Sequence, residues 1–190
     1  HKGTSYKVYH GSMHPLQSFA AEEIEKNPFA GIMMGIEGDA AAVQSAWAVA
    51  EALAATPFEI HTESKMLYHA SAVVASNYLV TLMNLAFQLL FASGVRSSNV
   101  YQILKPLING TLGNIENSGI PRALTGPIAR GDDTVVQAHV EQIREKAPTL
   151  LPLYKSLGRQ TIDIALAKET LSRTAAEKLR EILKDEPELN

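Results

Sequence analysis

Residues 62–95 read TESKMLYHASAVVASNYLVTLMNLAFQLLFASGV. The pattern predicts one long helix that is apolar enough to be buried. At about 100° per residue, Lys65, His69 and Ser76 share one sector of this helix. A second sector beside it carries Asn77, Thr81, Asn84 and Gln88. Buried amides and a buried lysine cost free energy unless a neighbouring helix or a ligand satisfies them, so the two polar stripes mark a candidate site.

The composition limits the classes of function. The 190 residues are 46% hydrophobic, which is enough for a real core, and the net charge of -3 provides no overall positive field for nucleic acid or anionic lipid. The absence of cysteine excludes disulfides and thiolate metal sites and fits a reducing cytoplasm. The sequence begins without a signal-peptide core, so we expect a cytoplasmic protein.

The apolar run over residues 78–95 is about as long as a short bilayer span. Asn84 and Gln88 lie within the run, and no cluster of lysine or arginine flanks it. We therefore expect a helix that is covered by its own protein or by a second subunit, with no membrane partner.

Before the long helix, the pattern predicts strands at residues 6–14, 29–36 and 58–61. An alanine-rich helix follows Asp39, its predicted N-cap, and runs to about Ala55, while Thr62 is the predicted cap of the long helix. This α/β part, residues 1–61, has too few elements for a complete parallel sheet. We expect the tail of a Rossmann-type sheet whose first strands lie upstream, followed by a helical domain over residues 62–190.

The second part reads as a series of helices. Ser97 or Ser98 is the predicted cap of a helix toward Pro106, a short helix follows over residues 111–118, and residues 119–132 read as a loop. Asp132 is the predicted start of a helix that ends before Pro148. Two further helices are expected, one over residues 150–171 and a last one with a capping box at residues 174–177.

Common catalytic motifs are missing. No Gly-x-Gly-x-x-Gly follows a strand, and no Walker loop, His-Glu-x-x-His or Gly-x-Ser-x-Gly is present. His10 and His14 lack helical spacing and a nearby carboxylate, so a metal site is not expected. Proteases, kinases and α/β-hydrolases are disfavoured.

Three groups of residues could carry chemistry. His14, Pro15 and Gln17 lie at the end of a strand, where ligands bind in open α/β sheets, although a structural turn is the alternative. Lys65 and His69 are i, i+4 neighbours that could polarise a carbonyl and exchange a proton, although a lysine extended to solvent and a core histidine are the alternative.

The third group is a loop. Two glycines and a proline restrict the path of Thr125-Gly126-Pro127 and Arg130-Gly131-Asp132, and Arg130 offers a fork for a carboxylate or phosphate. In a chain with no cysteine and no secretion signal, we interpret the Arg-Gly-Asp triplet as chance.

The motif order resembles a specific family. It consists of HPLQSF at residues 14–19, IEGD at 36–39, KxxYHA at 65–70, SN at 76–77 and ALTGPIARGD at 123–132. These motifs resemble the Rossmann-type oxidoreductases whose helical part is catalogued as domain of unknown function 2520. Such proteins are similar to pyrroline-5-carboxylate reductases, ketopantoate reductases and β-hydroxyacid dehydrogenases. The resemblance implies a C-terminal domain of the 6-phosphogluconate dehydrogenase C-terminal-like type, often a homodimer.

The resemblance also implies roles for the residues. Lys65, His69 and Asn77 would be catalytic, acting on the carbonyl, imine or hydroxyl group of a small metabolite. The substrate would meet Thr125, Gly126 and Arg130. The nicotinamide of NADP or NAD would lie near His14, Pro15 and Gln17, while the glycine-rich half that holds the cofactor is missing from this sequence. The alternative is a non-catalytic helical module whose polar stripes form a subunit interface.

Overall fold

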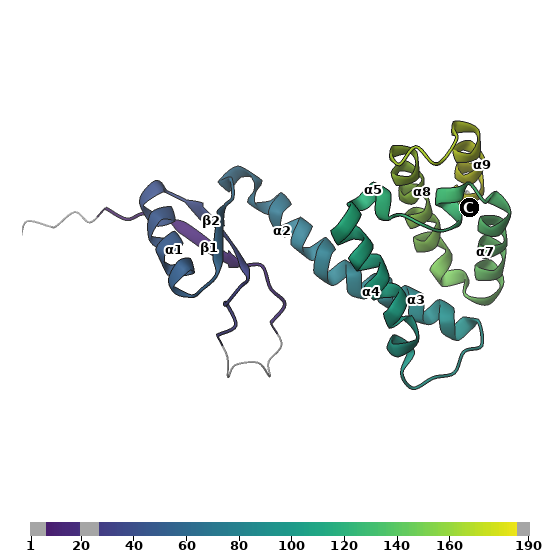
Figure 1. Ribbon diagram of the computed structural model, residues 1–190, viewed down its shortest axis with the longest axis horizontal. Coiled ribbons are helices and arrows are strands. Elements are labelled where there is room, and N and C mark those ends of the chain that lie inside the picture. Colours follow the sequence, from purple (N-terminus) through teal and green to yellow (C-terminus); the bar gives the residue numbers. More distant parts are fainter. Residues whose placement is uncertain (1–6, 20–26, 186–190) are drawn as a thin grey trace, which may run out of the picture. The chain divides into compact units, whose positions relative to one another are not determined.

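The computed structural model describes residues 7–19 and 27–185. The chain divides into two compact units, His1–Leu82 and Met83–Asn190. The small sheet belongs to the first unit and the second is helical, as the expected fold class requires (Figure 1). The division lies within a helix, and the domain boundary expected between residues 61 and 62 stays a prediction.

The first unit contains a three-stranded sheet in the order β1-β2-β3. Its strands are β1 (Gly11–Pro15), β2 (Met33–Gly38) and β3 (Thr56–Glu59), and each is shifted by a few residues from its predicted position. β2 and β3 are parallel, whereas β1 is antiparallel to β2. The described parts of the β1–β2 link, residues 16–19 and 27–32, hold no crossover helix, which an antiparallel pair does not need.

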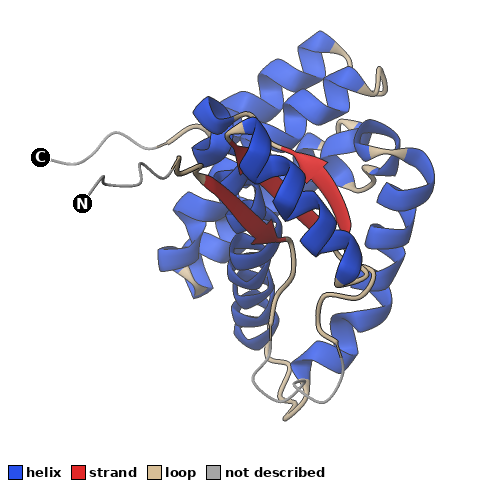
Figure 2. Cartoon of the chain, turned by 90° about the vertical axis from the view of Figure 1, so that its left-hand side faces the viewer, coloured by secondary structure: helices blue, strands red, loops and turns tan. Residues whose placement is uncertain are grey.

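One face of the sheet is covered by α1 (Ala40–Ala52), which packs against all three strands (Figures 1 and 2). Met34 and Ile36 of β2 are fully buried there, with Ala50 and Ala55. Asp39 precedes the helix as predicted, but its carboxylate accepts the His10 N–H at 2.8 Å and makes no capping bond. Because side chains alternate along a strand, Gly35 and Glu37 point to the opposite face.

A continuous helical segment, Thr62–Ala92, follows the sheet and is called the rod below. It begins with a 3-10 turn (Thr62–Ser64), continues as α2 (Lys65–Val73) and a π-helical stretch (Val74–Tyr78), and ends as α3 (Leu79–Ala92). Thr62 does not cap it, because its hydroxyl donates to Glu37 Oε2 at 2.8 Å. By length and composition the rod could cross a membrane, a property that core helices share. Only 6% of its most apolar window is buried, so this chain does not itself cover the rod, and covering by a second subunit stays a prediction.

The second unit has one main core. Its helices are α4 (Val100–Ser118), α5 (Ile120–Ala123), α6 (Pro127–Arg130), α7 (Asp133–Lys146), the 3-10 turn Pro148–Leu150, α8 (Leu151–Ala167) and α9 (Arg173–Leu183). The buried side chains come mainly from α7, α8 and α9, including Val136, Ile162 and Leu179. By contrast, α4 has no buried residue.

Several helix limits differ from the expected ones. α4 is unbroken, with Pro106 inside it, and Asn99 caps it by accepting the Gln102 N–H. The expected loop at residues 119–132 contains two short helices, α5 and α6. The last helix is capped by Ser172 and not by Thr174. Asp132 caps α7 as predicted, through the Val135 N–H at 3.1 Å.

Candidate functional site

The first unit holds a groove of about 630 Å³ between the end of β1 and the rod, which we call the rod groove. The rod supplies one wall through α2 and the π-helical stretch, and the segment after β1 supplies the other. The groove brings together five of the residues singled out from the sequence, namely His14, Pro15, Gln17, His69 and Asn77. Ser18, Ser71 and Ser76 add hydroxyl groups to its lining.

The two histidines of the rod groove are neighbours. Their ring centroids are 5.8 Å apart in an edge-to-face arrangement. His14 Nδ1 lies 3.0 Å from the hydroxyl of Tyr68, a residue with no role predicted from the sequence. A hydrogen bond at one ring nitrogen fixes the ring orientation, and so leaves Nε2 of His14 as the nitrogen that can meet a ligand.

Tyr68 reaches His14 because β2 has a glycine beneath it. A Cβ built on Gly35 would overlap Ile60 Cδ1 and lie 3.0 Å from the Tyr68 hydroxyl oxygen. Burial raises the pKa of Tyr68, so the phenol stays protonated and can donate at neutral pH. The Tyr68 ring also contacts Phe58 of β3 edge to face. α2 is therefore seated directly on this face of the sheet.

The π-helical stretch shapes the far end of the groove. Ser76 and Asn77 both lie within Val74–Tyr78, where the helix is wider than an α-helix. A count at 100° per residue across this stretch therefore does not describe where Asn77 points. Such π stretches occur often at functional sites.

Lys65 makes a different set of contacts from the one expected. Its Nζ donates to Glu37 Oε1 at 2.8 Å and to Ser12 Oγ at 2.9 Å. The Glu37 side chain is only 8% exposed, whereas that of Lys65 is 45% exposed. Lys65 is not among the residues that line the rod groove, although it lies one helical turn before His69.

Glu37 is fully engaged by donors. Lys65 and the Ser12 hydroxyl contact one carboxylate oxygen and the Thr62 hydroxyl contacts the other. The hydrogen bond from Lys65, followed by those from Ser12 and Thr62, lowers the pKa of Glu37 from 4.5 to about 2. Glu37 lies within a family motif, but no local pattern indicates its role, because its partners lie far away in the sequence.

The predicted substrate residues lie in the second unit. Thr125, Gly126 and Arg130 line a separate groove of about 450 Å³ there, together with Lys168 and Thr170. Gly126 has φ of +99°, a backbone conformation that side chains rarely adopt, and so requires glycine. The structure thus groups these three residues with one another.

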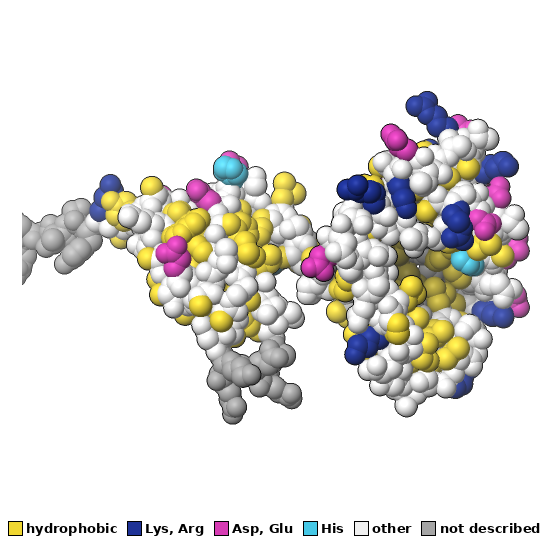
Figure 3. Space-filling view, in the orientation of Figure 1, with side chains coloured by type: hydrophobic (Ala, Val, Ile, Leu, Met, Phe, Trp, Pro, Cys, Tyr) yellow, Lys and Arg dark blue, Asp and Glu magenta, His cyan; other side chains and the backbone are white. Residues whose placement is uncertain are grey.

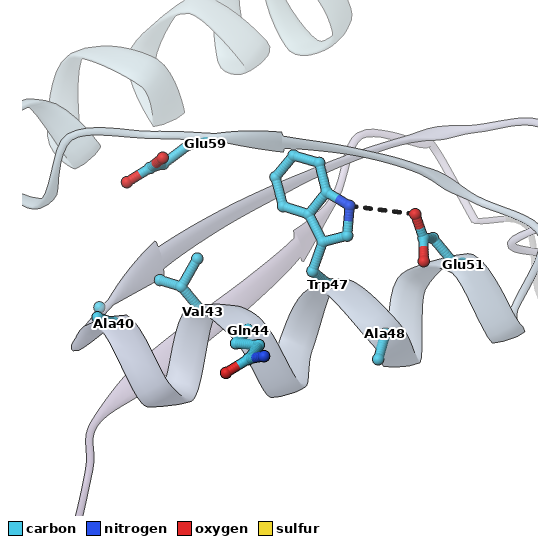
Figure 4. A pocket seen from close by; sticks show the side chains of 8 residues that line it. Ala40, Val43, Gln44, Trp47, Ala48, Glu51 and Glu59 are labelled. Atoms are coloured by element: carbon cyan, nitrogen blue, oxygen red, sulfur yellow. Dashed lines mark hydrogen bonds between the residues drawn. The ribbon is translucent and has the colours of Figure 1, made fainter.

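Another pocket, of about 540 Å³, lies beside α1 in the first unit (Figure 4). Trp47 stands in it and donates its indole N–H to Glu51 at 3.2 Å. Glu59 of β3 completes its polar lining with Gln44. No residue proposed from the sequence lies in this pocket.

Comparison with known proteins places the chain in a family. Residues 32–161, more than half of the chain, match the family model described as "Domain of unknown function (DUF2520)". The search among curated proteins found no match. Two solved structures share the fold. Protein TM1727 from Thermotoga maritima is 28% identical, with a TM-score of 0.70 over 84% of this chain and 62% of that one.

The second structure is that of the "putative NADP oxidoreductase BF3122 from Bacteroides fragilis". It is 24% identical, with a TM-score of 0.67 over 82% of this chain and 58% of that one. The present chain therefore spans about three fifths of the length of both structures. At this identity the second likeness concerns the fold alone.

Proposed function

The chain belongs to the DUF2520 family, and we propose that it is the C-terminal part of an NAD(P)-dependent oxidoreductase. The substrate is a small metabolite with a carbonyl, imine or hydroxyl group at the reacting carbon. The observation that carries the proposal is the rod groove, which collects two histidines and two side-chain amides from segments far apart in sequence. The Bacteroides fragilis protein is named as a "putative NADP oxidoreductase", which agrees with this class of activity.

The residues present fit one end of a nicotinamide cofactor. Gln17 and Asn77 can exchange hydrogen bonds with a carboxamide, and the groove volume of about 630 Å³ suits a small ring and a small substrate. The sequence given contains no glycine-rich turn for the pyrophosphate. In this proposal the cofactor, bound largely by the rest of the protein, supplies or accepts the hydride.

The residues of this chain position the substrate and handle the proton. His69 exchanges a proton with the reacting oxygen or nitrogen, Asn77 orients that group, and His14, Pro15 and Gln17 face the nicotinamide. Lys65 uses two of its three N–H donors on Glu37 and Ser12. The third donor can polarise the substrate heteroatom, and the ion pair fixes its direction. In the second unit, Thr125, Gly126 and Arg130 are the proposed substrate-binding residues.

The test uses the protein with its nucleotide-binding region. His69→Ala should lower turnover by about 10² to 10⁴-fold, the usual contribution of a general acid or base, while folding is retained. Lys65→Met should lower it by at least about 10²-fold. The measurement is NADPH consumption with a panel of small keto and imino acids. Glu63→Gln, on the exposed first turn of the rod, is the matched control.

Turnover of His69→Ala at the level of the parent protein would remove this residue from the mechanism. Because Lys65→Met leaves Glu37 with only two donors, its thermal midpoint must be measured beside its activity. A fall in activity that tracks unfolding would assign Lys65 to structure alone.

A second candidate function has its own support. The rod and α4 expose many large apolar side chains, including Leu67, Val80 and Leu107. Such surfaces mark subunit interfaces, so we propose a homodimer, and a non-catalytic dimerisation module remains the rival of the enzyme. Saturable NADPH binding by the protein with its nucleotide-binding region supports the enzyme, and no binding at millimolar cofactor supports the module. Either form is proposed to be cytoplasmic, with no nucleic acid or membrane partner.

A further inference from the structure

The groove of the second unit has two cationic side chains and no acidic one in its lining. Arg130 comes from the end of α6, and Lys168 follows the last turn of α8. The other lining residues are Leu124, Thr125, Gly126, Ala129 and Thr170, none of which carries a charge. Lys168 was not singled out from the sequence, because it lies 38 residues beyond Arg130. Figure 3 shows that lysine and arginine on the face in view lie mostly over this unit.

Asp132 and Asp133, which follow Arg130 closely in the sequence, have other partners, and Glu169 beside Lys168 does not line the groove. The Asp132 carboxylate accepts the Val135 N–H and caps α7. Asp133 lies 3.5 Å from Lys178 of α9. The Asp of the Arg-Gly-Asp triplet therefore serves the helix, and neither carboxylate lines the groove beside Arg130.

Two hydrogen bonds from the segment that follows α8 hold the wall of the groove in place. Lys168 Nζ donates to the Leu124 carbonyl at 2.7 Å, and the Thr170 hydroxyl donates to the Ala129 carbonyl at 3.0 Å. These two bonds hold Leu124, directly after α5, and Ala129 within α6. Lys168 uses one of its three N–H donors in the bond to Leu124, so its charge and its other two donors remain available to a ligand.

We infer that Arg130 and Lys168 form a binding site for a doubly negative oxyanion, either a phosphate or a pair of carboxylates. Two cations without a lining carboxylate favour a dianion over a monoanion, since each added charge pair contributes to the attraction. The planar guanidinium contacts two oxygens at once, and the ammonium contacts a third. Resting on the proposed function, this site takes a small metabolite that carries a phosphate or two carboxylates.

The experiment is a calorimetric titration of the 190-residue chain at pH 8 and constant ionic strength. The probes are inorganic phosphate, succinate and acetate. We expect saturable binding of phosphate or succinate, at least about tenfold tighter than that of acetate. A preference for phosphate identifies a phosphate-bearing ligand, and a preference for succinate identifies a dicarboxylate.

Arg130→Gln and Lys168→Gln should each weaken binding of the preferred probe by about tenfold, because each removes a charge-assisted hydrogen bond. Lys168→Arg, which keeps the charge and the donor to Leu124, should retain binding. Lys105→Gln is the matched control, since Lys105 of α4 is an exposed lysine of the same unit outside the groove. Thermal midpoints of all variants show whether the fold is kept.

Acetate binding as tight as that of the dianions would overturn the inference, as would wild-type affinity in both glutamine variants. An equal loss in Lys105→Gln would also overturn it, because the attraction would then be general. The titration needs no nicotinamide, so its outcome is separate from that of the turnover test. The two experiments together would recognise an oxyanion site in a protein that lacks redox activity. They would equally recognise redox activity in a protein that lacks this site.

Discussion

At the scale of single residues, Lys65 shows what a helical pattern can and cannot predict. Its i, i+4 relation to His69 follows from the sequence, and both side chains belong to the first unit. Its bonds to Glu37 and Ser12 depend on the register of β1 and β2, which places Ser12 opposite Glu37. The lysine is therefore both a structural partner and a proposed catalytic group.

The Glu37 network predicts a dependence of stability on acid. The pKa of Glu37 is lowered to about 2 in the folded protein, so the ionised network stabilises the fold above pH 4.5. This contribution should be lost as the pH falls from about 5 to 2, since the unfolded state then takes up the proton more readily. Thermal unfolding followed by circular dichroism across this range measures it.

Glu37→Gln is the variant for that measurement. It should lower the thermal midpoint at pH 7, and its midpoint should fall less steeply between pH 5 and pH 2. Glu63→Gln, at an exposed position, should keep the steeper profile of the parent chain. Parallel profiles for the parent and Glu37→Gln would contradict the network's role.

At the scale of elements, the sequence predicted the positions of the helices in the second unit more accurately than it predicted their ends. The cap Asp132 and the helix end at Ser118 were predicted correctly, but Ser172 caps the last helix in place of Thr174 and Asn99 replaces Ser97 or Ser98. Capping residues stand close together in these segments, and the backbone path selects among them. The π-helical stretch at residues 74–78 had no signal that the pattern of apolar residues could reveal.

The core of the second unit gives a prediction for one helix. Ile162 of α8 is fully buried, whereas Leu153 of the same helix is 39% exposed. Ile162→Ala should lower the free energy of unfolding by about 2–5 kcal/mol, through lost burial and a cavity. Leu153→Ala should cost less than about 1 kcal/mol. Urea denaturation measures both, and equal losses would contradict this description of the core.

At the scale of the whole molecule, the exposed apolar side chains are the main free-energy cost that the fold of this chain does not explain. The rod is mostly exposed within this chain, and α4 has no buried residue although Leu107 and Ile115 are apolar. A single chain that exposes this much apolar surface is expected to associate. A second copy of the chain could cover such a surface.

Leu107 is a direct probe of that association, because its side chain is 70% exposed. If α4 lies in a dimer interface, Leu107→Glu should weaken the dimer by about tenfold or more, since burying a charge there is unfavourable. Size exclusion with light scattering over a range of concentrations measures the change. Gln102→Glu, on the same helix, is the control, and a monomer at every concentration for the parent chain would refute the proposed homodimer.

The sequence by itself determined the family, the order of elements and the change from an α/β part to a helical part, because periodicity, caps and local motifs are properties of neighbouring residues. It also singled out His14, Pro15, Gln17, His69 and Asn77 by chain position. Only the tertiary structure decided that these five line one groove, that Lys65 pairs with Glu37, and that Lys168 joins Arg130. These contacts join segments far apart in the chain, so strand register and helix packing must form before they exist.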